Sequence, residues 1–321
     1  MMTRLAGLAT VALSLATLTA DAVEPQIVVY QGPCDASAVA ALDAEHFVVG
    51  TDEMDTLLVY RRGQSAAVGS IDLTRFLGTK ADEESDIEGA AAIGGRIYWV
   101  TSHGSNSKGK TQHSRHRFFA TDIVPGKPPS LKPVGEPYTK LLRDMGKVRA
   151  LKHYKLEDAA RLPAEAEGGL NIEGLAATPE GTLLIGFRNP LPHRRALIVP
   201  LENPAELIAG KAAKFGAPIE LDLGQRGIRS ITQVDGGYLI VAGPITDSGS
   251  FALFKWSGIA GHGAILLDAA LKDLRPEALF ATGSGNDVQL LSDDGGIRVN
   301  GIECKKLPQA QHKFRSLIIK P

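Results

Sequence analysis

The chain has 321 residues, a formal net charge of -1 and 35 glycines. This length suits one large domain or two small ones, and a near-neutral chain without a dominant basic stretch argues against a nucleic-acid-binding protein. Glycine, proline and aspartate are frequent in the turns, which favours many short strands over a helical bundle.

The first 22 residues have the pattern of an export signal. Arg4 supplies a positive start, residues 5–18 are apolar or small, and residues 20–22 match an A-x-A cleavage site. Fourteen apolar residues are too few to span a bilayer, so a membrane anchor is the weaker alternative. We therefore expect an exported protein, periplasmic or secreted, whose residues 23–321 form a single domain that is not embedded in a membrane.

The chain contains two cysteines, Cys34 and Cys304, near opposite ends of the expected mature protein. Export would place both in an oxidising compartment, where disulfides form and persist. A bridge between them would close a loop of about 270 residues, which is worth roughly 4–5 kcal/mol in the chain-entropy model. We predict this disulfide; two buried free thiols are the alternative.

Five segments share one pattern: a short apolar strand, a turn, and a second strand. They begin at Asp35, Asp86, Asn171, Gly227 and Arg275. A third strand is expected at residues 56–61, 118–123, 196–201 and 251–256, and a weaker fourth at 66–73, 219–223 and 265–268. Three to four strands in units of about 50 residues are typical of a β-propeller. We therefore predict an all-β fold, a β-propeller with five countable blades.

The second and third units are separated by a longer interval, which leaves room for a sixth blade. Residues 139–167 of this interval are rich in Leu, Ala, Lys, Arg and Glu, and apolar residues recur there at helix-like spacing, at Leu142, Met145, Val148 and Leu151. We therefore favour a short helical insertion over a sixth blade.

Strand-like runs at residues 26–31 and 314–320 flank the five units. Propellers often close by pairing strands from the two ends of the chain in one blade, because this removes a free strand edge. We expect such a closure here, and it would bring the two cysteines together.

The third position of the units is charged in four of the five cases. In chain order the residues there are Ser37, Glu88, Glu173, Arg229 and Glu277. The second strands end on a matching set fifteen residues later, or sixteen in the last unit: Asp52, His103, Arg188, Pro244 and Asp293. The first strand of a propeller blade is innermost, and a hairpin returns the chain to nearly the same height. Both sets should therefore meet around the central channel.

Charges near such an axis are costly to bury unless they are paired or bind something. One interpretation is a structural Glu–Arg network that ties the blades together. The other is a binding site, in which Glu88, Glu173 and Glu277 would hold a divalent cation such as calcium. Two basic loops, residues 101–117 and 187–195, would form a cationic rim around this centre. A small anionic ligand would then bind at the rim, where the second loop carries Arg188 and Asn189.

Two functions stay open. The first is a metal-assisted hydrolase of phosphoesters or esters, with Glu173 as ligand or base, His103 as general acid or base, and Arg188 and Arg229 stabilising negative charge. The second is a non-enzymatic propeller that binds a ligand or a protein. We expect a monomer without an organic cofactor, since no dinucleotide, nucleophile-elbow, zinc-protease or Walker motif occurs.

Several blocks resemble a known family: "SDIEGAA", "GLNIEGLAATPEGTLLIGFRNPL", "ALIVPLENP" and "LDLGQRGIRSI". They are similar to the bacterial domain-of-unknown-function 3616 family over roughly residues 35–320, which implies no established activity. The E-G-L motifs resemble, more distantly, the propeller superfamily described as having esterase-like activity of phytase. That resemblance implies a propeller, calcium and phosphoester chemistry, but Ser37 and Arg229 stand where further carboxylates would be expected.

Overall fold

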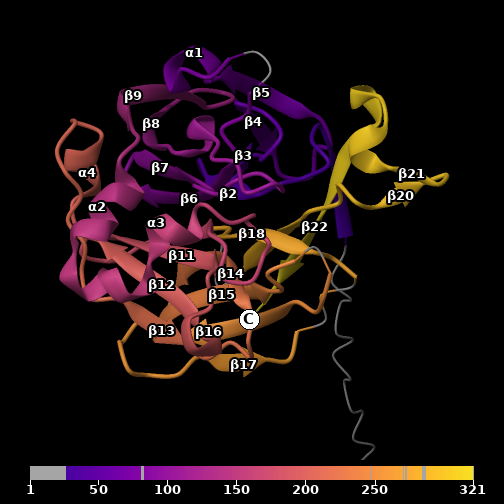
Figure 1. Ribbon diagram of the computed structural model, residues 1–321. Coiled ribbons are helices and arrows are strands. Elements are labelled where there is room, and N and C mark those ends of the chain that lie inside the picture. The colour runs from indigo at the N-terminus through magenta and orange to yellow at the C-terminus, as the bar shows by residue number, and fades with distance from the viewer. Residues whose placement is uncertain are drawn as a thin grey trace, which may run out of the picture.

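The computed structural model describes residues 27–80, 83–246, 248–269, 271, 273–283 and 287–320. The predicted signal peptide, residues 1–22, lies outside the described residues. Five four-stranded antiparallel sheets are arranged around a common centre (Figure 1), which confirms the predicted five-bladed β-propeller. The first strands of adjacent blades contact one another in a closed ring, β2 with β6, β6 with β10, β10 with β14, β14 with β18 and β18 with β2.

The first two blades are built from consecutive strands. Blade 1 contains β2 (Ala38–Ala41), β3 (His46–Gly50), β4 (Thr56–Arg61) and β5 (Ala67–Asp72). Blade 2 contains β6 (Ile87–Ile93), β7 (Arg96–Thr101), β8 (Phe118–Val124) and β9 (Ser130–Tyr138). The short helix α1 (Thr74–Leu77) joins the two blades, and η1 (His113–Arg115) lies in the loop between β7 and β8. The outer strand β9 is one that the sequence pattern did not predict.

The next two blades follow the same order. Blade 3 contains β10 (Asn171–Ala177), β11 (Leu183–Asn189), β12 (Ala196–Leu201) and β13 (Ile219–Leu221), with η3 (Pro192–Arg194) and α4 (Pro204–Leu207) in its loops. Blade 4 contains β14 (Gly227–Val234), β15 (Gly237–Gly243), β16 (Ala252–Trp256) and β17 (Ile265–Leu267). The expected third and fourth strands of these units are therefore present with small shifts at their ends.

Blade 5 closes the ring with strands from both ends of the chain. Its strand order is β18 (Pro276–Ala281), β19 (Val288–Ser292), β22 (Lys313–Ile319) and β1 (Ile27–Gln31). Between β19 and β22 the chain forms the small hairpin β20 (Arg298–Val299) and β21 (Ile302–Glu303), followed by η4 (Cys304–Lys306) and η5 (Gln309–Gln311). Figure 1 shows this yellow segment projecting beside the rest of the ring.

The long interval between blades 2 and 3 contains helices rather than a further sheet. Residues 139–170 form α2 (Leu141–Lys147), η2 (Arg149–Tyr154) and α3 (Leu156–Ala159). The apolar side chains that predicted this insertion pack on blades 2 and 3, since Leu142, Met145 and Leu151 are buried in one cluster with Phe118 and Phe187. The count of five blades is therefore preferred over six.

The hydrophobic core lies mainly between adjacent blades. Trp99 and Phe119 of blade 2 stack with ring centroids 6.1 Å apart, in a cluster that also contains Val48 and Leu57 of blade 1. Between blades 5 and 1, Tyr30 of the closing strand lies 5.2 Å from Phe47 and 5.4 Å from Phe314, measured between ring centroids. Tightly packed aromatic side chains of this kind bury large apolar areas. They hold the ring together where the two chain ends meet.

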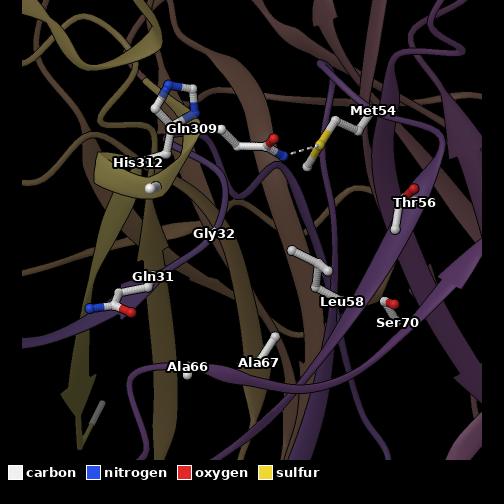
Figure 2. A pocket seen from close by; sticks show the side chains of 11 residues that line it. Gln31, Gly32, Met54, Thr56, Leu58, Ala66, Ala67, Ser70, Gln309 and His312 are labelled. Atoms are coloured by element: carbon white, nitrogen blue, oxygen red, sulfur yellow. Dashed lines mark hydrogen bonds between the residues drawn. The ribbon is translucent and has the colours of Figure 1, made fainter. Parts of the chain in front are cut away.

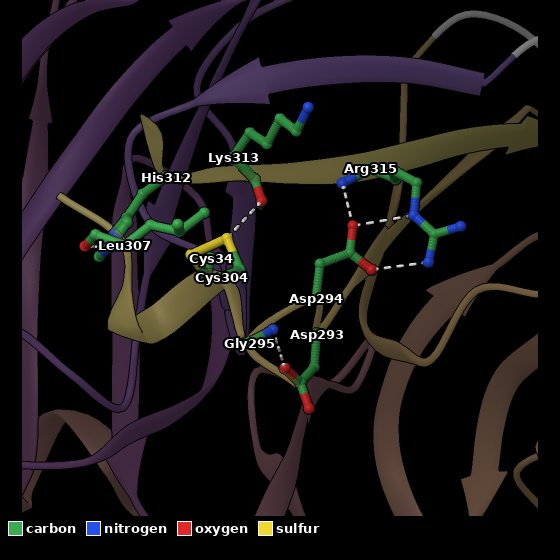
Figure 3. The surroundings of a disulfide bond; sticks show 9 residues. All are labelled: Cys34, Asp293, Asp294, Gly295, Cys304, Leu307, His312, Lys313 and Arg315. Atoms are coloured by element: carbon green, nitrogen blue, oxygen red, sulfur yellow. Dashed lines mark hydrogen bonds and ion pairs between the residues drawn. A yellow bond between two sulfur atoms is a disulfide. The ribbon is translucent and has the colours of Figure 1, made fainter. Parts of the chain in front are cut away.

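The predicted disulfide is present between Cys34 and Cys304, whose Cα atoms are 5.9 Å apart. Figure 3 shows it beside an ion pair in which Arg315 of β22 contacts both carboxylate oxygens of Asp294, at 2.8 and 2.9 Å. The backbone N–H of Asp294 also donates to the carbonyl oxygen of Cys34, at 2.9 Å. Across the described ranges, no helix is long and apolar enough to cross a membrane.

Candidate functional site

A β-bulge marks the third-position residue in four of the five blades. Between β6 and β7 the pairing passes from Ile87 with Thr101 to Gly89 with Val100, and so leaves out Glu88. The same one-residue shift occurs in blades 3, 4 and 5, at Glu173, Arg229 and Glu277. A bulge inserts an extra residue into one strand and redirects its side chain. The repeated charge in the sequence is therefore a repeated bulge in the structure.

These bulged residues line a central cavity of about 260 Å³. Nine carboxylate side chains and five cationic side chains among the described residues line it. The carboxylates are Asp35, Asp52, Glu53, Asp86, Glu88, Glu165, Glu173, Glu277 and Asp293, and the cations are Arg115, Arg188, Arg229, Arg275 and Lys305. The structure thus brings together seven of the residues that the two aligned sets predicted: Asp52, Glu88, Glu173, Arg188, Arg229, Glu277 and Asp293.

Three predicted members do not reach the cavity as expected. His103 is fully buried and is not among the lining residues; burial and the nearby His116 lower its pKa to about 3. Ser37 lies behind the cavity wall and donates a hydrogen bond to Asp35 Oδ1, at 3.1 Å. Pro244 contributes its carbonyl oxygen, which accepts a hydrogen bond from Arg188 Nε at 3.2 Å. The prediction of His103 as an acid or base at this site is therefore not supported by its position.

Asn189 is also placed differently from its expected role as a ligand-binding residue. Its Nδ2 donates to the carbonyl oxygens of Ala164 and Ala166, at 2.8 and 2.6 Å. Ala164 and Glu165 line the cavity. Asn189 therefore holds the helical insertion against blade 3, where the insertion forms one wall of the site.

One part of the cavity is a dense Glu–Arg network. Glu173 Oε1 is 3.0 Å from Arg188 Nη1, and Glu173 Oε2 is 2.9 Å from Arg229 Nε. Arg229 also forms an ion pair with Glu277, and Arg188 Nη2 lies 3.5 Å from Glu165 Oε1. Glu173 is only 2 % exposed, so these pairs offset the cost of burying its charge. The structural Glu–Arg network, one of the two interpretations of the sequence, is therefore present in this part of the cavity.

The other part of the cavity holds carboxylates that form no ion pair with a described residue, namely Asp35, Asp52 and Glu88. Burial and the neighbouring carboxylate of Asp52 raise the pKa of Asp35 well above its usual value, and burial and Asp86 raise the pKa of Asp52 to about 8. Burial and Glu173 likewise raise the pKa of Glu88 well above the usual range. Like charges held close together without water disfavour ionisation of each group. This part of the site is an acidic cluster in which burial and like charges outweigh the cations nearby, such as Arg115 beside Asp52.

Two features of this cluster favour a bound cation. Asp35, Glu277 and Asp293 each offer a carboxylate oxygen that lies within 4.8 Å of the other two. Glu88 is 8 % exposed and faces the same cavity, yet no described residue gives it a hydrogen bond or an ion pair. Oxygen ligands at this spacing suit calcium, which takes 6–8 oxygens at about 2.3–2.6 Å. The residues present therefore fit a hard divalent cation.

The sequence analysis missed several lining residues. Asp35, Asp86, Asn171 and Arg275 stand two residues before the third-position residues. Side chains two apart in a strand share one face, so this spacing was the signal that could have found them. Arg115, Glu165 and Lys305 come from loops, and no local pattern marks them.

The disulfide lies directly behind the cavity. Cys34 precedes Asp35, and Cys304 precedes Lys305. Figure 3 shows Asp293 and Gly295 beside it, with the Gly295 N–H donating to Asp293 Oδ1 at 2.7 Å. The bond therefore fixes the two chain segments that supply Asp35, Asp293 and Lys305 to the site.

A second pocket, of about 420 Å³, lies away from the axis (Figure 2). Gln309 Nε2 approaches Met54 Sδ at 4.0 Å across one side of it, and small or apolar residues such as Leu58 and Ala67 line the rest. His312 is the only titratable residue among its described lining residues, and its Nε2 lies 2.8 Å from the carbonyl oxygen of Leu307. Among its described lining residues this pocket offers a ligand no ionisable group besides His312, whereas charged side chains converge in the central cavity, so that cavity is the candidate site.

Solved structures with a similar arrangement differ widely in their printed functions. Glutaminyl cyclase from Myxococcus xanthus is 12% identical with a TM-score of 0.46, covering 92% of this chain and 95% of its own. The PQQ-bound aldose sugar dehydrogenase from Streptomyces coelicolor is also 12% identical with a TM-score of 0.46, covering 92% and 99%. The Cps50 (Swd1) β-propeller domain from Myceliophteria thermophila is 9% identical with a TM-score of 0.41, covering 92% and 100%. Likeness at this level carries no argument about activity.

No curated protein matches the sequence. The distant resemblance to the phytase-like propellers stays a prediction. The resemblance to the domain-of-unknown-function family, by contrast, is confirmed over most of the chain. Because residues 35–120 and 139–289 match the family described as "Protein of unknown function (DUF3616)", the chain belongs to that family.

Proposed function

We propose that this propeller binds a divalent cation, calcium, in the acidic part of its central cavity and a small anionic ligand beside it. The observation that carries the proposal is Glu88, which is nine-tenths buried, faces the cavity and has no partner among the described residues. A cation held by Asp35, Glu277 and Asp293 would add positive charge to a cavity in which Glu88 has no ion pair with a described residue.

The proposed ligand set differs from the one expected from sequence, which was Glu88, Glu173 and Glu277. Both carboxylate oxygens of Glu173 face arginines, at 3.0 and 2.9 Å. Arginines therefore occupy both of its oxygens, whereas Glu277 pairs with Arg229 through Oε1 alone. We accordingly assign Glu173 to the structural network and keep Glu277 as a ligand. Asp35 and Asp293 take its place beside Glu277, and Glu88 completes the acidic wall.

Calcium titration of dialysed protein by calorimetry tests the proposal. We expect the wild-type protein to bind calcium, and Glu88→Gln and Asp293→Asn to weaken binding at least about tenfold, a loss of about 1.4 kcal/mol. Glu180→Gln is the matched control, because Glu180 is exposed on a distant turn. Affinity should rise with pH, since burial raises the pKa of the ligand Asp35 and of its neighbour Glu88, and carboxylates that bind the cation must lose their protons. A wild-type protein that ignores calcium would contradict the proposal.

A metal-assisted hydrolase of phosphoesters or esters is the second candidate. Glu88 favours it, because this buried carboxylate faces the cavity without a partner among the described residues, and burial raises its pKa and so makes it a stronger base. A bound cation would stabilise negative charge that develops on a substrate. Calcium-dependent turnover of a phosphoester or ester panel, lost in Glu88→Gln and kept in Glu180→Gln, would support this candidate. No turnover with calcium bound would favour the non-enzymatic binding protein.

We also propose that the protein is exported and acts as a monomer. The observed disulfide supports an oxidising compartment, and the first 22 residues have the pattern of a signal peptide. N-terminal sequencing of protein recovered from outside the cytoplasm should begin at Val23, and light scattering should give the monomer mass. A retained N-terminus would contradict the export proposal.

A further inference from the structure

Of the five cationic side chains that line the cavity, three form ion pairs with described residues and two do not. Arg188 and Arg229 contact Glu173, and Arg115 Nη1 lies 3.1 Å from Asp86 Oδ2. Arg275 and Lys305 also line the cavity, but no described residue forms an ion pair with either of them. Their charges are therefore available to a ligand.

The backbone fixes where Arg275 stands. Its N–H donates to Ser292 Oγ at 3.0 Å, and its carbonyl oxygen accepts a hydrogen bond from the Asp293 N–H at 2.8 Å. Its guanidinium lies against Gly296, where an added methyl group would come within 3.1 Å of Nη1. The glycine therefore allows the guanidinium to approach the backbone closely at this corner of the cavity.

Lys305 reaches the same corner from the other side of the loop. Its backbone N–H donates to the carbonyl oxygen of Gly295 at 3.3 Å, and its Cδ passes 3.8 Å from where a methyl group on Gly295 would lie. Because Cys304 precedes it, the disulfide anchors this position. The backbone N–H of Gly296 has no hydrogen-bond partner among the described residues, so it is a third available donor.

We infer that Arg275, Lys305 and the Gly296 N–H form an anion-binding corner, which receives a carboxylate or phosphate group of the ligand. This inference rests on the proposed cation site, because Asp293 and Glu277 lie next to the corner in sequence and line the same cavity. One anionic oxygen of the ligand would face the cation while others accept hydrogen bonds from the corner. Arginine and backbone N–H groups are suited to such oxygens.

The inference changes which residues select the ligand. The sequence favoured Arg188 and Arg229 for the anion, but their carboxylate partners already occupy them. A ligand that bound there would have to break buried ion pairs, which is costly. At the corner, a ligand would contact Arg275 and Lys305 without breaking an ion pair to any described residue.

Calorimetric titration with glycerol 3-phosphate and with succinate, in saturating calcium, tests the corner. At least one of these probes should bind wild-type protein, and Arg275→Gln and Lys305→Gln should each weaken that binding about tenfold. Arg194→Gln is the matched control, since this arginine is exposed and does not line the central cavity. Calcium affinity should be equal or tighter in both corner variants, because neither side chain is a ligand and each loses a nearby positive charge. The probe that binds identifies the anionic group.

The outcomes separate this inference from the proposed function. Calcium binding without any probe binding, or probe binding that both corner variants retain in full, would overturn the corner and leave the cation site standing. Probe binding that depends on Arg275 and Lys305 in a protein that ignores calcium would overturn the cation site instead. If Arg275→Gln does not fold, Lys305→Gln decides, because Lys305 is exposed and its side chain has no packing role.

Discussion

At the scale of single residues, equivalent positions in the repeat have different physical roles. Glu88 and Glu173 both occupy a bulge in the first strand of a blade. Glu173 lies between Arg188 and Arg229, whereas Glu88 faces other carboxylates and has no partner among the described residues. Neighbours that come from other blades therefore decide whether a buried carboxylate stabilises the fold or is available to a ligand.

We expect Glu173→Gln to lower the free energy of unfolding by roughly 3–5 kcal/mol, because it removes the buried carboxylate that Arg188 and Arg229 share. Glu88→Gln should cost the calcium-free protein no stability, since it removes a charge that burial and its neighbours already disfavour. Urea denaturation of both variants in a calcium chelator measures the contrast. Equal losses of unfolding free energy in the two variants would contradict the different roles that we assign to Glu173 and Glu88.

At the scale of elements, the inner strands place the site by combining bulges with close packing between blades. The glycine that starts β14 is an example. A methyl group on Gly227 would lie 1.9 Å from the carbonyl oxygen of Arg188, which belongs to the second strand of the preceding blade. The two backbones are this close where Arg188 and Arg229 both reach Glu173, so blade spacing and ion pairing depend on each other.

Gly227→Ala should therefore destabilise the protein by at least 1–3 kcal/mol, roughly the cost of overpacking a core, because a backbone atom cannot move aside as a side chain can. Gly95→Ala is the control. That glycine lies in a turn where an added methyl group meets nothing within 4 Å, so its effect should stay within about 0.5 kcal/mol. Urea midpoints of the two variants give the comparison; similar midpoints would contradict the close approach at Gly227.

At the scale of the whole molecule, the chain segments that close the ring also supply residues of the site. The strand β1 pairs with β22 beside β19, so both ends of the chain complete blade 5. The disulfide then fixes the segments on either side of the closure, and these segments supply Asp35, Asp293 and Lys305. If these segments were less firmly held, Asp35 and Asp293 could move apart, and the proposed cation site would be weakened.

The double variant Cys34→Ser with Cys304→Ser should lose up to roughly 4–5 kcal/mol of unfolding free energy, the chain-entropy value for a loop of this length. It should also bind calcium more weakly than the wild type while remaining folded, because the β1–β22 pairing is retained. Urea denaturation and calcium titration measure the two effects. Unchanged calcium affinity would show that the strands alone hold the site.

Much of the fold could be predicted from the sequence because a blade is a local unit. Alternating apolar runs, glycine-rich turns and the repeat of about 50 residues are properties of neighbouring residues, and they predicted five blades, the helical insertion and the closing strands. The disulfide followed from the closure. The outer strand β9 was not predicted, because its sequence, SLKPVGEPY, contains two prolines and a glycine, which are unusual within strands.

The sequence also determined that charged residues recur at one register of the inner strands, and hence that Glu88, Glu173, Arg229 and Glu277 converge. Only the tertiary structure decided how those charges are paired, because the partners come from different blades and from the insertion. In the structure, His103 does not line the cavity, and Asn189 hydrogen-bonds the insertion instead of facing a ligand. Arg275 and Lys305, which the sequence did not single out, line the cavity. Register is a property of one strand, whereas the pKa and the partner of a buried charge depend on everything that surrounds it.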